Sequence, residues 1–450
     1  MKKVSFKLIS VTIAIAMLFS VLQISTVAAE VDYKITNPYE SVTAYLGSDN
    51  NHYKTNLHTH STYSDADIDL SAMVKGFYNQ NYDVLAFADH GVIGVEWDKT
   101  PTLLALYQYN HVLLNDQSHL STEEYEAILN GTYKDDHTTR TNKRGMQSVT
   151  GAIEANYLVA QKNHINGYFM NNNSTEGVMG NEGDFETMVK MIEDAGGISH
   201  INHPGDWLGS AGDPDIARDP GNVQYFANLM RKYDSCLGIE VYNAYDRPTS
   251  SDRILWDELL KVVIPEGRNV WGFGNSDAHN LFDIDTAFMD FVMPSYSDEN
   301  LRTAMENGTF FSVSRYEAGE RIGNGEAYPQ VTAIMVDESA DTITIIGRNC
   351  DTINWIADGE VIKTATGKNG VTSSTIKLRS HADDISCYVR AELQGEGGKT
   401  LTQAFVCDDG NMDDLINRGP ANTTVPVDFI QVLRSLINLI LRTANQVIGK

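Results

Sequence analysis

Two patterns of apolar and polar residues alternate along the first two thirds of the chain. Short, almost continuously apolar runs, such as "DVLAFADH" at 83–90 and "CLGIEVYN" at 236–243, are followed by stretches in which apolar residues recur every three or four positions. The first pattern predicts strands buried on both faces, and the second predicts amphipathic helices. From about residue 50 to 320 the sequence therefore predicts an α/β fold, with parallel strands and crossover helices in a barrel or an open sheet.

The helices in this region have clear start and stop signals. Residues 184–197 place four apolar side chains at positions i, i+3, i+4 and i+7 and end in two glycines. Further helices are expected at 71–80, with Ser71 or Asp69 as the cap, and at 251–263.

Residues 94–147 interrupt the alternation. Within them, 121–131 predicts a short helix with a capping box between Ser121 and Glu124, and the remainder is polar. Because an insertion of this length falls between two predicted strands, we expect it to lie over a site as a lid or specificity loop. Three histidines in it are expected to be solvent-exposed: His111, His119 and His137.

The last third follows a different pattern. Residues 329–408 form short alternating runs separated by turn signals such as "ADGE" and "GEGGK", which predicts a small β-sandwich over 326–410. Residues 411–450 are expected to form a linker and an amphipathic helix, "VDFIQVLRSLINLILRTANQVIG". The polar face of that helix has only two arginines, so docking on the core or self-association is expected in preference to membrane attachment.

The N-terminus has the three parts of a secretory signal peptide. Lys2, Lys3 and Lys7 precede a long apolar run, and small residues precede Glu30, so cleavage is expected after Ala29. The chain of 450 residues has a net charge of -26, and removing the signal peptide makes it more acidic, because it takes away lysines and no acidic residue. A secreted, acidic protein is a poor ligand for long nucleic acids.

Cysteine usage does not predict a disulfide framework. The four cysteines are Cys236, Cys350, Cys387 and Cys407, and none belongs to a C-x-x-C motif. Export permits a disulfide bond among the last three, but the sequence does not decide which of them pair.

Residues that ligate metals recur where the predicted strands end. "HTH" at 58–60 places two imidazoles on one face of an extended segment, which suits a metal ion. Similar endings follow at "ADH", "GAIEAN", "HINHP", "EVYN" and "NSDAH". In parallel α/β barrels these ends share one rim, and the nitrogen and oxygen ligands suit Zn, Mn or Fe. The sequence therefore predicts a metal site at this rim.

Taken in order, "NLHTHSTYSDA", "VLAFADHG", "GAIEAN", "HINHPG", "GIEVYN" and "GNSDAH" resemble the PHP (polymerase and histidinol phosphatase) superfamily over residues 52–315. The resemblance implies a distorted (β/α)7 TIM-like barrel over 30–325, two or three metal ions at its rim, and hydrolysis of phosphate esters. The C-terminal β-sandwich is also similar to that of secreted relatives.

The resemblance also implies a role for each ligand. His58 and His60 match the first metal site, Asp277 joins them, and Glu154 matches the bridging glutamate in preference to Glu176 or Glu182. The second metal site would be completed by His164 and His203, and the third by Asp65, His90 and His279. Protonation of the leaving group is open between His203, His279 and bound water, and Asp277 is expected to take part in catalysis.

Several neighbouring residues have two interpretations. Asp89 either orients a ligand or caps a helix, His200 is expected to be structural or to support a ligand, and Glu240 is either a hydrogen-bond acceptor or a ligand. Asn243 and Arg247 are candidates for binding substrate, with a surface ion pair as the alternative for Arg247.

The expected function is a secreted metal-dependent hydrolase acting on a small phosphomonoester, a nucleotide or a short oligonucleotide, the last as an exonuclease-like activity. A carboxylic or carbamate ester or amide hydrolase with the same metal centre is the alternative. A non-catalytic surface-binding protein with a structural metal site is a third interpretation.

Overall fold

The computed structural model describes residues 32–101, 119–155, 163–171, 184–208, 212–325 and 327–415. The expected signal peptide and C-terminal helix, part of the insertion with His111, and the rejected Glu176 and Glu182 lie outside these ranges. Within them, no helix is long and apolar enough to cross a bilayer.

The part of the chain that carries the predicted ligands contains two sheets. In the first, β2 (His52–Asn56), β3 (Val84–Ala86) and β4 (Gln147–Val149) run parallel, and β10 (Ala287–Val292) and β11 (Phe310–Ser314) continue the sheet beyond β2 in antiparallel fashion. The second has the order β5 (Ile153–Ala155), β6 (Ile165–Tyr168), β7 (Ile198–Ile201), β8 (Cys236–Asn243) and β9 (Trp271–Asn275).

Parallel pairing holds for β2–β3–β4 and for β7–β8–β9, but the prediction of parallel strands is wrong for β6 and β10. A parallel crossover needs a dozen or more residues and usually a helix. Only residues 156–164 connect β5 to β6, and no helix lies in 276–286 between β9 and β10, so the chain reverses direction at both places. The ladders of the described strands form no closed barrel.

Two single-residue bridges connect these two sheets. Thr59, just beyond β2, pairs with Ala278, just beyond β9, and His90, beyond β3, pairs with Glu154 of β5. Thr59, His90 and Ala278 lie just beyond the carboxyl ends of their strands, and Glu154 lies within β5. Both bridges involve or adjoin predicted metal ligands.

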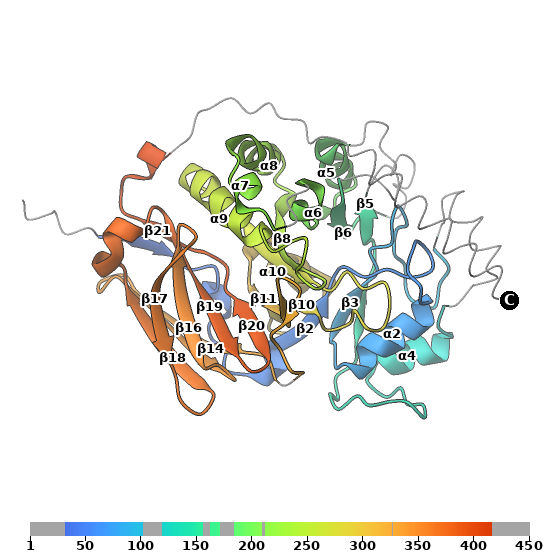
Figure 1. Ribbon diagram of the computed structural model, residues 1–450. Coiled ribbons are helices and arrows are strands. Elements are labelled where there is room, and N and C mark those ends of the chain that lie inside the picture. Colours follow the sequence, from blue (N-terminus) through green and yellow to red (C-terminus); the bar gives the residue numbers. More distant parts are fainter. Residues whose placement is uncertain are drawn as a thin grey trace, which may run out of the picture.

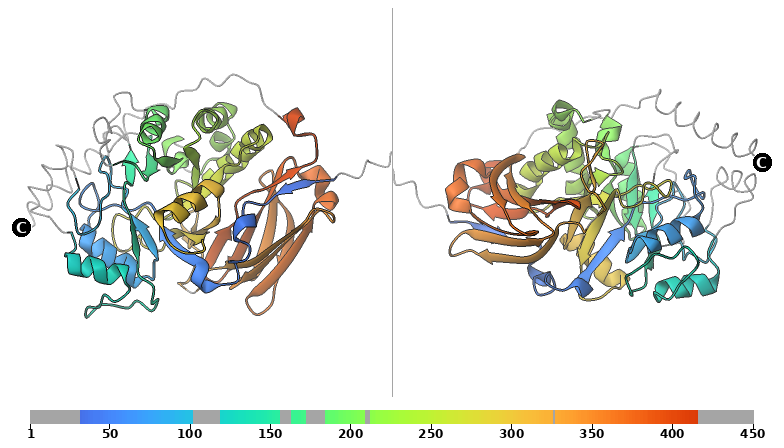
Figure 2. Two further views of the ribbon diagram at one scale, coloured as in Figure 1. Left: turned by 180° about the vertical axis from the view of Figure 1, so that it is seen from behind. Right: turned by 60° about the horizontal axis from the view of Figure 1, so that its bottom comes forward.

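The predicted helices form as expected. Asp69 caps α2 (Leu70–Asn79) by accepting a hydrogen bond from the backbone of Ala72, and the capping box of Ser121 and Glu124 opens α4 (Thr122–Leu129). The other helices are α5 (Phe185–Asp194), α6 (Pro204–Leu208), α7 (Pro214–Ala217), α8 (Pro220–Lys232), α9 (Asp252–Val263) and α10 (Asp298–Asn307). Figures 1 and 2 show α5, α7, α8 and α9 on the outside of the second sheet, with α2 and α4 beside β3.

The C-terminal strands form two antiparallel layers around one apolar core, which includes Ile345 and Trp355. One layer contains β14 (Gln330–Asp337), β15 (Thr342–Arg348) and β18 (Val371–Lys377). The other contains β16 (Thr352–Ala357), β17 (Glu360–Thr366), β19 (Tyr388–Gly395), β20 (Gly398–Leu401) and β21 (Phe405–Asp408). The short strands β12 (Tyr316–Glu317) and β13 (Glu320–Arg321) form a separate hairpin.

This C-terminal part is continuous with the rest of the molecule. β20 pairs with β11, and β1 (Lys34–Thr36), from the start of the described chain, pairs with β21. The sequence pattern did not indicate either pairing. All four cysteines are buried and none forms a disulfide bond.

A buried ion pair couples fold stability to pH. His52 Nδ1 lies 2.8 Å from Asp290 Oδ2, its Nε2 lies 2.9 Å from the carbonyl oxygen of Leu46, and both side chains of the pair are buried. Burial alone would lower the pKa of His52, but the charge and hydrogen bond of Asp290 outweigh it and raise that pKa above its usual value.

We therefore expect His52→Gln to destabilise the protein most at low pH. A raised folded-state pKa stabilises the protein fully below the unfolded pKa of about 6.5, and this contribution disappears as pH rises through the folded value. The difference in unfolding free energy between wild type and variant should be about 2 kcal/mol near pH 5.5 and smaller at pH 9. Denaturant titrations at the two pH values measure it, and a difference independent of pH would contradict the assignment.

Candidate metal centre

The nine predicted ligands converge at one rim of the two sheets. Groups of three or four can be chosen whose ligand atoms all lie within 4.8 Å of one another. The residues in these groups are His58, His60, Asp65, His90, Glu154, His164, His203, Asp277 and His279. Eight of them lie in a strand or within four residues of a strand end, and Asp65 lies on the loop between β2 and α2.

Strand direction explains how His164 reaches this rim. The other histidine ligands follow strands, whereas His164 precedes β6. Because β6 runs antiparallel to β5 and β7, its amino end lies beside their carboxyl-side loops. Glu154 lies inside β5, where its backbone bridges to His90. The reversed strand that the parallel prediction missed is therefore what brings His164 to the site.

The four ligand groups overlap pairwise and form a cycle. The group with Asp65 and His279 shares His60 with the group containing Asp277 and shares His90 with the group containing His164. The remaining group, which contains His203, shares His58 and Glu154 with its neighbours. Ions placed in neighbouring groups would therefore share ligands, which is the arrangement of a multinuclear centre.

The group of His58, His60 and Asp277 has the spacing of ligand atoms around an ion. The Nε2 atoms of His58 and His60 each lie 3.1 Å from Asp277 Oδ1, and all three atoms are buried without a hydrogen-bond partner. Two ligand atoms of a tetrahedral ion, each about 2.1 Å from it, lie roughly 3.4 Å apart. Buried polar atoms without partners are costly, so the donor set fits a divalent ion.

Glu154 is the most connected residue of the centre. Its carboxylate oxygens lie 2.9 Å from His164 Nδ1, 3.0 Å from His90 Nδ1 and 3.3 Å from His60 Nε2. They also lie 3.5 Å from the Nε2 atoms of His58 and His203. A carboxylate within reach of five imidazoles is placed to bridge two ions, as the sequence-based assignment requires.

The charges of the centre shift its pKa values in opposite directions. Burial alone would raise the pKa of Glu154, but the imidazoles of His164, His90 and His58 hold it well below its usual value. Burial lowers the pKa of His164 to about 4. Burial opposes the shift at His279, but the neighbouring Asp65 raises its pKa to about 9.

The group that contains Asp65 and His279 is the most exposed to solvent. His279 Nε2 lies 3.3 Å from Asp65 Oδ1, and His90 Nε2 lies 3.6 Å from Asp65 Oδ2. The side chains of His279, Asp65 and Asp277 are 26%, 18% and 17% exposed, whereas each of the other six ligands is at most 7% exposed. The centre is therefore most accessible to solvent from the side of His279.

Two ligands have strained backbone conformations. His203 and Asp277 have positive φ angles of 29° and 47°, in the left-handed region that residues with a Cβ rarely adopt. Each follows a strand closely, so the turn points the side chain back over the rim. Such strain, of order 1–3 kcal/mol for each residue, typically persists at functional sites.

Glu240 orients ligands and belongs to none of the ligand groups. Its carboxylate lies 2.9 Å from His58 Nδ1 and accepts hydrogen bonds from the His203 backbone and from the side chains of Asn243 and Asn275. The Nδ1 contact leaves Nε2 of His58 as the atom that faces Asp277. Asn243 is therefore engaged in holding Glu240.

Asp89 supports His60 through a serine. It accepts hydrogen bonds from the backbone and hydroxyl of Ser61 and from the hydroxyl of Ser64, and Ser64 Oγ lies 3.3 Å from His60 Nδ1. No helix begins at Asp89, so the helix-cap interpretation does not apply. His200 lies behind the centre, where its Nε2 contacts the hydroxyl of Tyr168 at 2.9 Å and its ring stacks on Phe273.

Sequence reasoning missed two supporting residues. Asn202 donates a 2.7 Å hydrogen bond to Glu154, and Ser64 contacts His60. Alternation in "HINHP" places Asn202 on the same face as His200, which is a signal that could have identified it. Ser64 gave no such signal, because its contact depends on the loop that Asp89 holds.

The exposed Arg247 has no hydrogen bond or ion pair with any described residue, so the surface ion pair considered for it does not form within this part of the chain. Its aliphatic stem lies against Gly319. An exposed guanidinium without a partner remains available to an anion.

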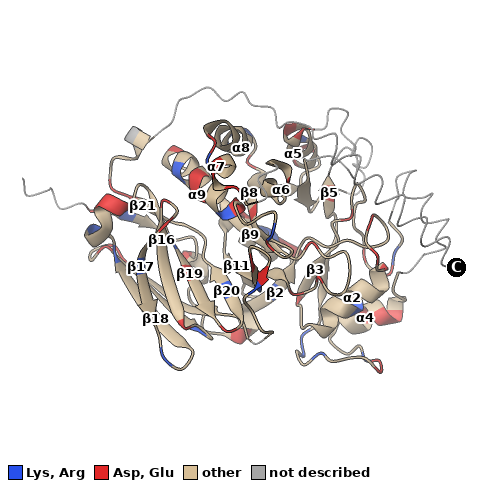
Figure 3. Ribbon diagram, in the orientation of Figure 1, with Lys and Arg blue, Asp and Glu red and all other residues tan. Residues whose placement is uncertain are grey.

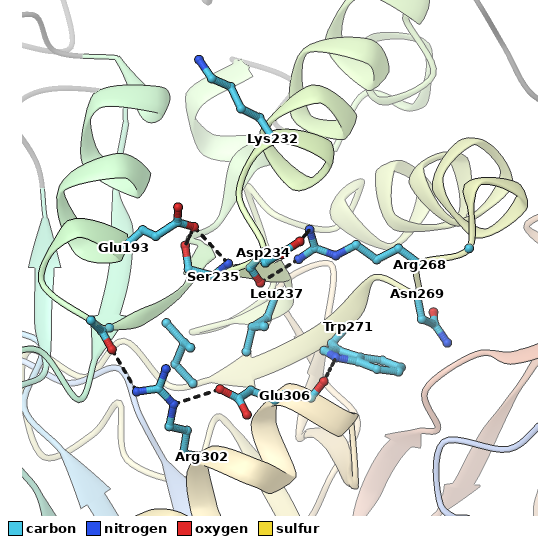
Figure 4. A pocket seen from close by; sticks show the side chains of 14 residues that line it. Glu193, Lys232, Asp234, Ser235, Leu237, Arg268, Asn269, Trp271, Arg302 and Glu306 are labelled. Atoms are coloured by element: carbon cyan, nitrogen blue, oxygen red, sulfur yellow. Dashed lines mark hydrogen bonds and ion pairs between the residues drawn. The ribbon is translucent and has the colours of Figure 1, made fainter.

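A separate cavity of about 680 Å³ lies at the other ends of the strands, next to the starts of β7, β8 and β9 (Figure 4). Its cations are already engaged. Arg268 donates to the carbonyl oxygens of Tyr233 and Asp234, and Arg302 donates to Glu306 and to the carbonyl oxygen of Gly196. This cavity contains no candidate metal ligand group.

No protein family and no curated protein matches this sequence. Among solved structures, the chain is similar to a two-domain protein from Bacteroides vulgatus described as containing a predicted PHP-like metal-dependent phosphoesterase, with 15% identity and a TM-score of 0.40 over 78% of this chain and 95% of that one. It is also similar to PsfC from Pseudomonas syringae, with 16% identity and a TM-score of 0.32 over 55% of this chain and 84% of that one.

A third similar structure is a lesion-specific endonuclease from Pyrococcus furiosus, with 13% identity and a TM-score of 0.30 over 83% of this chain and 74% of that one. Similarities at this level do not transfer an activity.

Proposed function

We propose that this chain is an exported metal-dependent hydrolase of the PHP superfamily that cleaves small phosphate esters. One observation carries the proposal: nine ligands form four overlapping groups in which Glu154 and three histidines are shared. Ions that share ligands lie close enough to act on one ester, which a single structural ion does not require. The two bridges between the sheets suit a distorted TIM-like arrangement with the site at its rim.

The charge of the centre favours a phosphate. Six of the nine ligands are histidines and three are carboxylates, so bound divalent ions leave the cluster net positive within an acidic protein. Figure 3 shows Lys and Arg as short, scattered segments of the described chain. When bound, such ions polarise the ester and lower the pKa of water towards neutrality.

The chain's own residues have separable roles in this proposal. Asp277 holds the position between His58 and His60, while His203 and His279 stand at opposite sides of the cluster as candidates for proton transfer. Arg247 would contact an oxygen of the substrate, because its guanidinium has no partner of its own among the described residues. Asn243, the other candidate for binding substrate, donates hydrogen bonds to Glu240 and to Asp277.

The first experiment combines metal analysis with an activity assay. The purified mature protein should contain two or three divalent ions for each chain, should release phosphate from a chromogenic phosphomonoester, and should lose that activity on chelation. Restoring Zn, Mn or Fe separately should identify the active ion. Metal content without phosphate release would contradict the proposal, and hydrolysis of a chromogenic carboxylic ester in a parallel assay would then favour the alternative hydrolase.

A further inference from the structure

Exposed apolar side chains gather beside the open edge of the metal centre. The described chain has seven large hydrophobic residues that are exposed, and three of them, Tyr245, Leu281 and Phe282, lie on the loops after β8 and β9. Phe282 is 86% exposed and lies three residues beyond the ligand His279. Isolated exposed apolar residues are common, but a group of them next to a reactive centre indicates a binding surface.

The two loops are fixed to each other. The Tyr245 hydroxyl lies 3.3 Å from the carbonyl oxygen of Phe282 and 3.0 Å from Asp283 Oδ1. Asp283 in turn accepts hydrogen bonds from the backbone of His279 and Asn280. The position of Phe282 relative to His279 is therefore set by hydrogen bonds, and a ring bound there would meet a preorganised surface.

The three apolar residues are not equivalent. Leu281 packs against Gly76 of α2, so it anchors its loop. Tyr245 is 37% exposed and its ring makes an edge-on contact with Tyr316, with centroids 4.9 Å apart. Phe282 is left with most of its ring in solvent, on the side from which the centre is most accessible to solvent.

We propose that Phe282 and Tyr245 form a subsite for a flat aromatic ring in the leaving group, so that the substrates are phosphate esters of aryl alcohols or nucleosides. The inference rests on the proposed function, because the phosphate must occupy the metal centre for its ester group to reach Phe282. Stacking on an exposed aromatic side chain accepts any ring with a π face, which is why aryl groups and nucleobases share this chemistry.

The test uses matched pairs of substrates on the metal-loaded enzyme. Phenyl phosphate is compared with cyclohexyl phosphate, and a nucleoside 5′-monophosphate with ribose 5-phosphate, so each pair differs in the aromatic ring. We expect Phe282→Ala to lower kcat/KM for the aromatic member about tenfold more than for its partner, mainly through KM. Phe282→Tyr should restore most of this loss. Met335→Ala, at an exposed position on β14, should leave the ratio of the two kcat/KM values in each substrate pair as in wild type.

The outcomes separate the two proposals. If Phe282→Ala lowers the kcat/KM preference for the aromatic member only in the nucleotide pair, the subsite binds a nucleobase. If it does so only in the phenyl pair, the subsite binds an aryl group. Wild-type hydrolysis of the esters with equal effects of Phe282→Ala on both members of each pair overturns the aromatic subsite and leaves the proposed function standing. Failure of the metal-loaded wild type to hydrolyse any of the four esters overturns the proposed function and the subsite with it.

Discussion

Replacing His58 and His60 together by alanine is expected to abolish turnover and to remove metal ions while leaving the fold mostly intact. Their Nε2 atoms converge on Asp277, and each residue belongs to two of the four ligand groups, so the double variant disrupts three groups at once. We expect kcat/KM to fall by roughly 1,000-fold or more. Elemental analysis, phosphatase assays and thermal unfolding of the same preparation would measure all three properties.

A matched control removes two histidines elsewhere. His119 and His137 are both exposed and belong to no ligand group, so His119→Ala/His137→Ala should keep wild-type metal content and activity. Retained turnover in the His58→Ala/His60→Ala variant would show that the ligand assignment is wrong. Unfolding of that variant would be uninformative by itself, so the single variants should be assayed alongside it.

Glu154→Gln is expected to lower metal content and kcat/KM nearly as much as the double histidine variant, with a much smaller change in side-chain shape. The side chain keeps its size, but it loses the negative charge that faces five imidazoles, and its amide group cannot bridge two ions. We expect at least one ion for each chain to be lost and kcat/KM to fall by roughly 100-fold or more.

Metal titration monitored by calorimetry would follow the loss of ions in Glu154→Gln. Glu306→Gln, on the exposed surface of α10, is the corresponding control and should bind metal as the wild type does. An unchanged metal stoichiometry in Glu154→Gln would mean that Glu154 is not a bridging ligand, even if activity declined.

Local sequence signals predicted the elements better than their pairing. Apolar spacing and capping residues identified α2, α4, α5 and α9, because these features act within a few residues. The direction of β6 depends on the length of a connection and on neighbours 30 or more residues away, as the pairing of Asn166 with His200 illustrates. The pairing of β1 with β21 joins the two ends of the described chain, and no local pattern encodes it.

The site was easier to anticipate than the sheet order, since its residues occur in short motifs. All nine predicted ligands fall into groups with ligand spacing, whereas Glu176 and Glu182, the alternatives to Glu154, lie outside the described residues. The supporting contacts were harder to anticipate. The pairing of Glu240 with His58 and the contact of Ser64 with His60 join residues through the fold, and only the three-dimensional arrangement reveals them.

The two single-residue bridges between the sheets have a consequence for folding. One joins Glu154 to His90, and the other lies between His58 and His60 on one side and between Asp277 and His279 on the other. Ions held by these side chains would cross-link the two sheets at both seams. Metal affinity and the closure of the sheets are then thermodynamically coupled, because a chain whose sheets separate loses ligands from every ion at once. The centre would therefore act as a cross-link of the fold as well as a catalyst, and its ions would bind cooperatively.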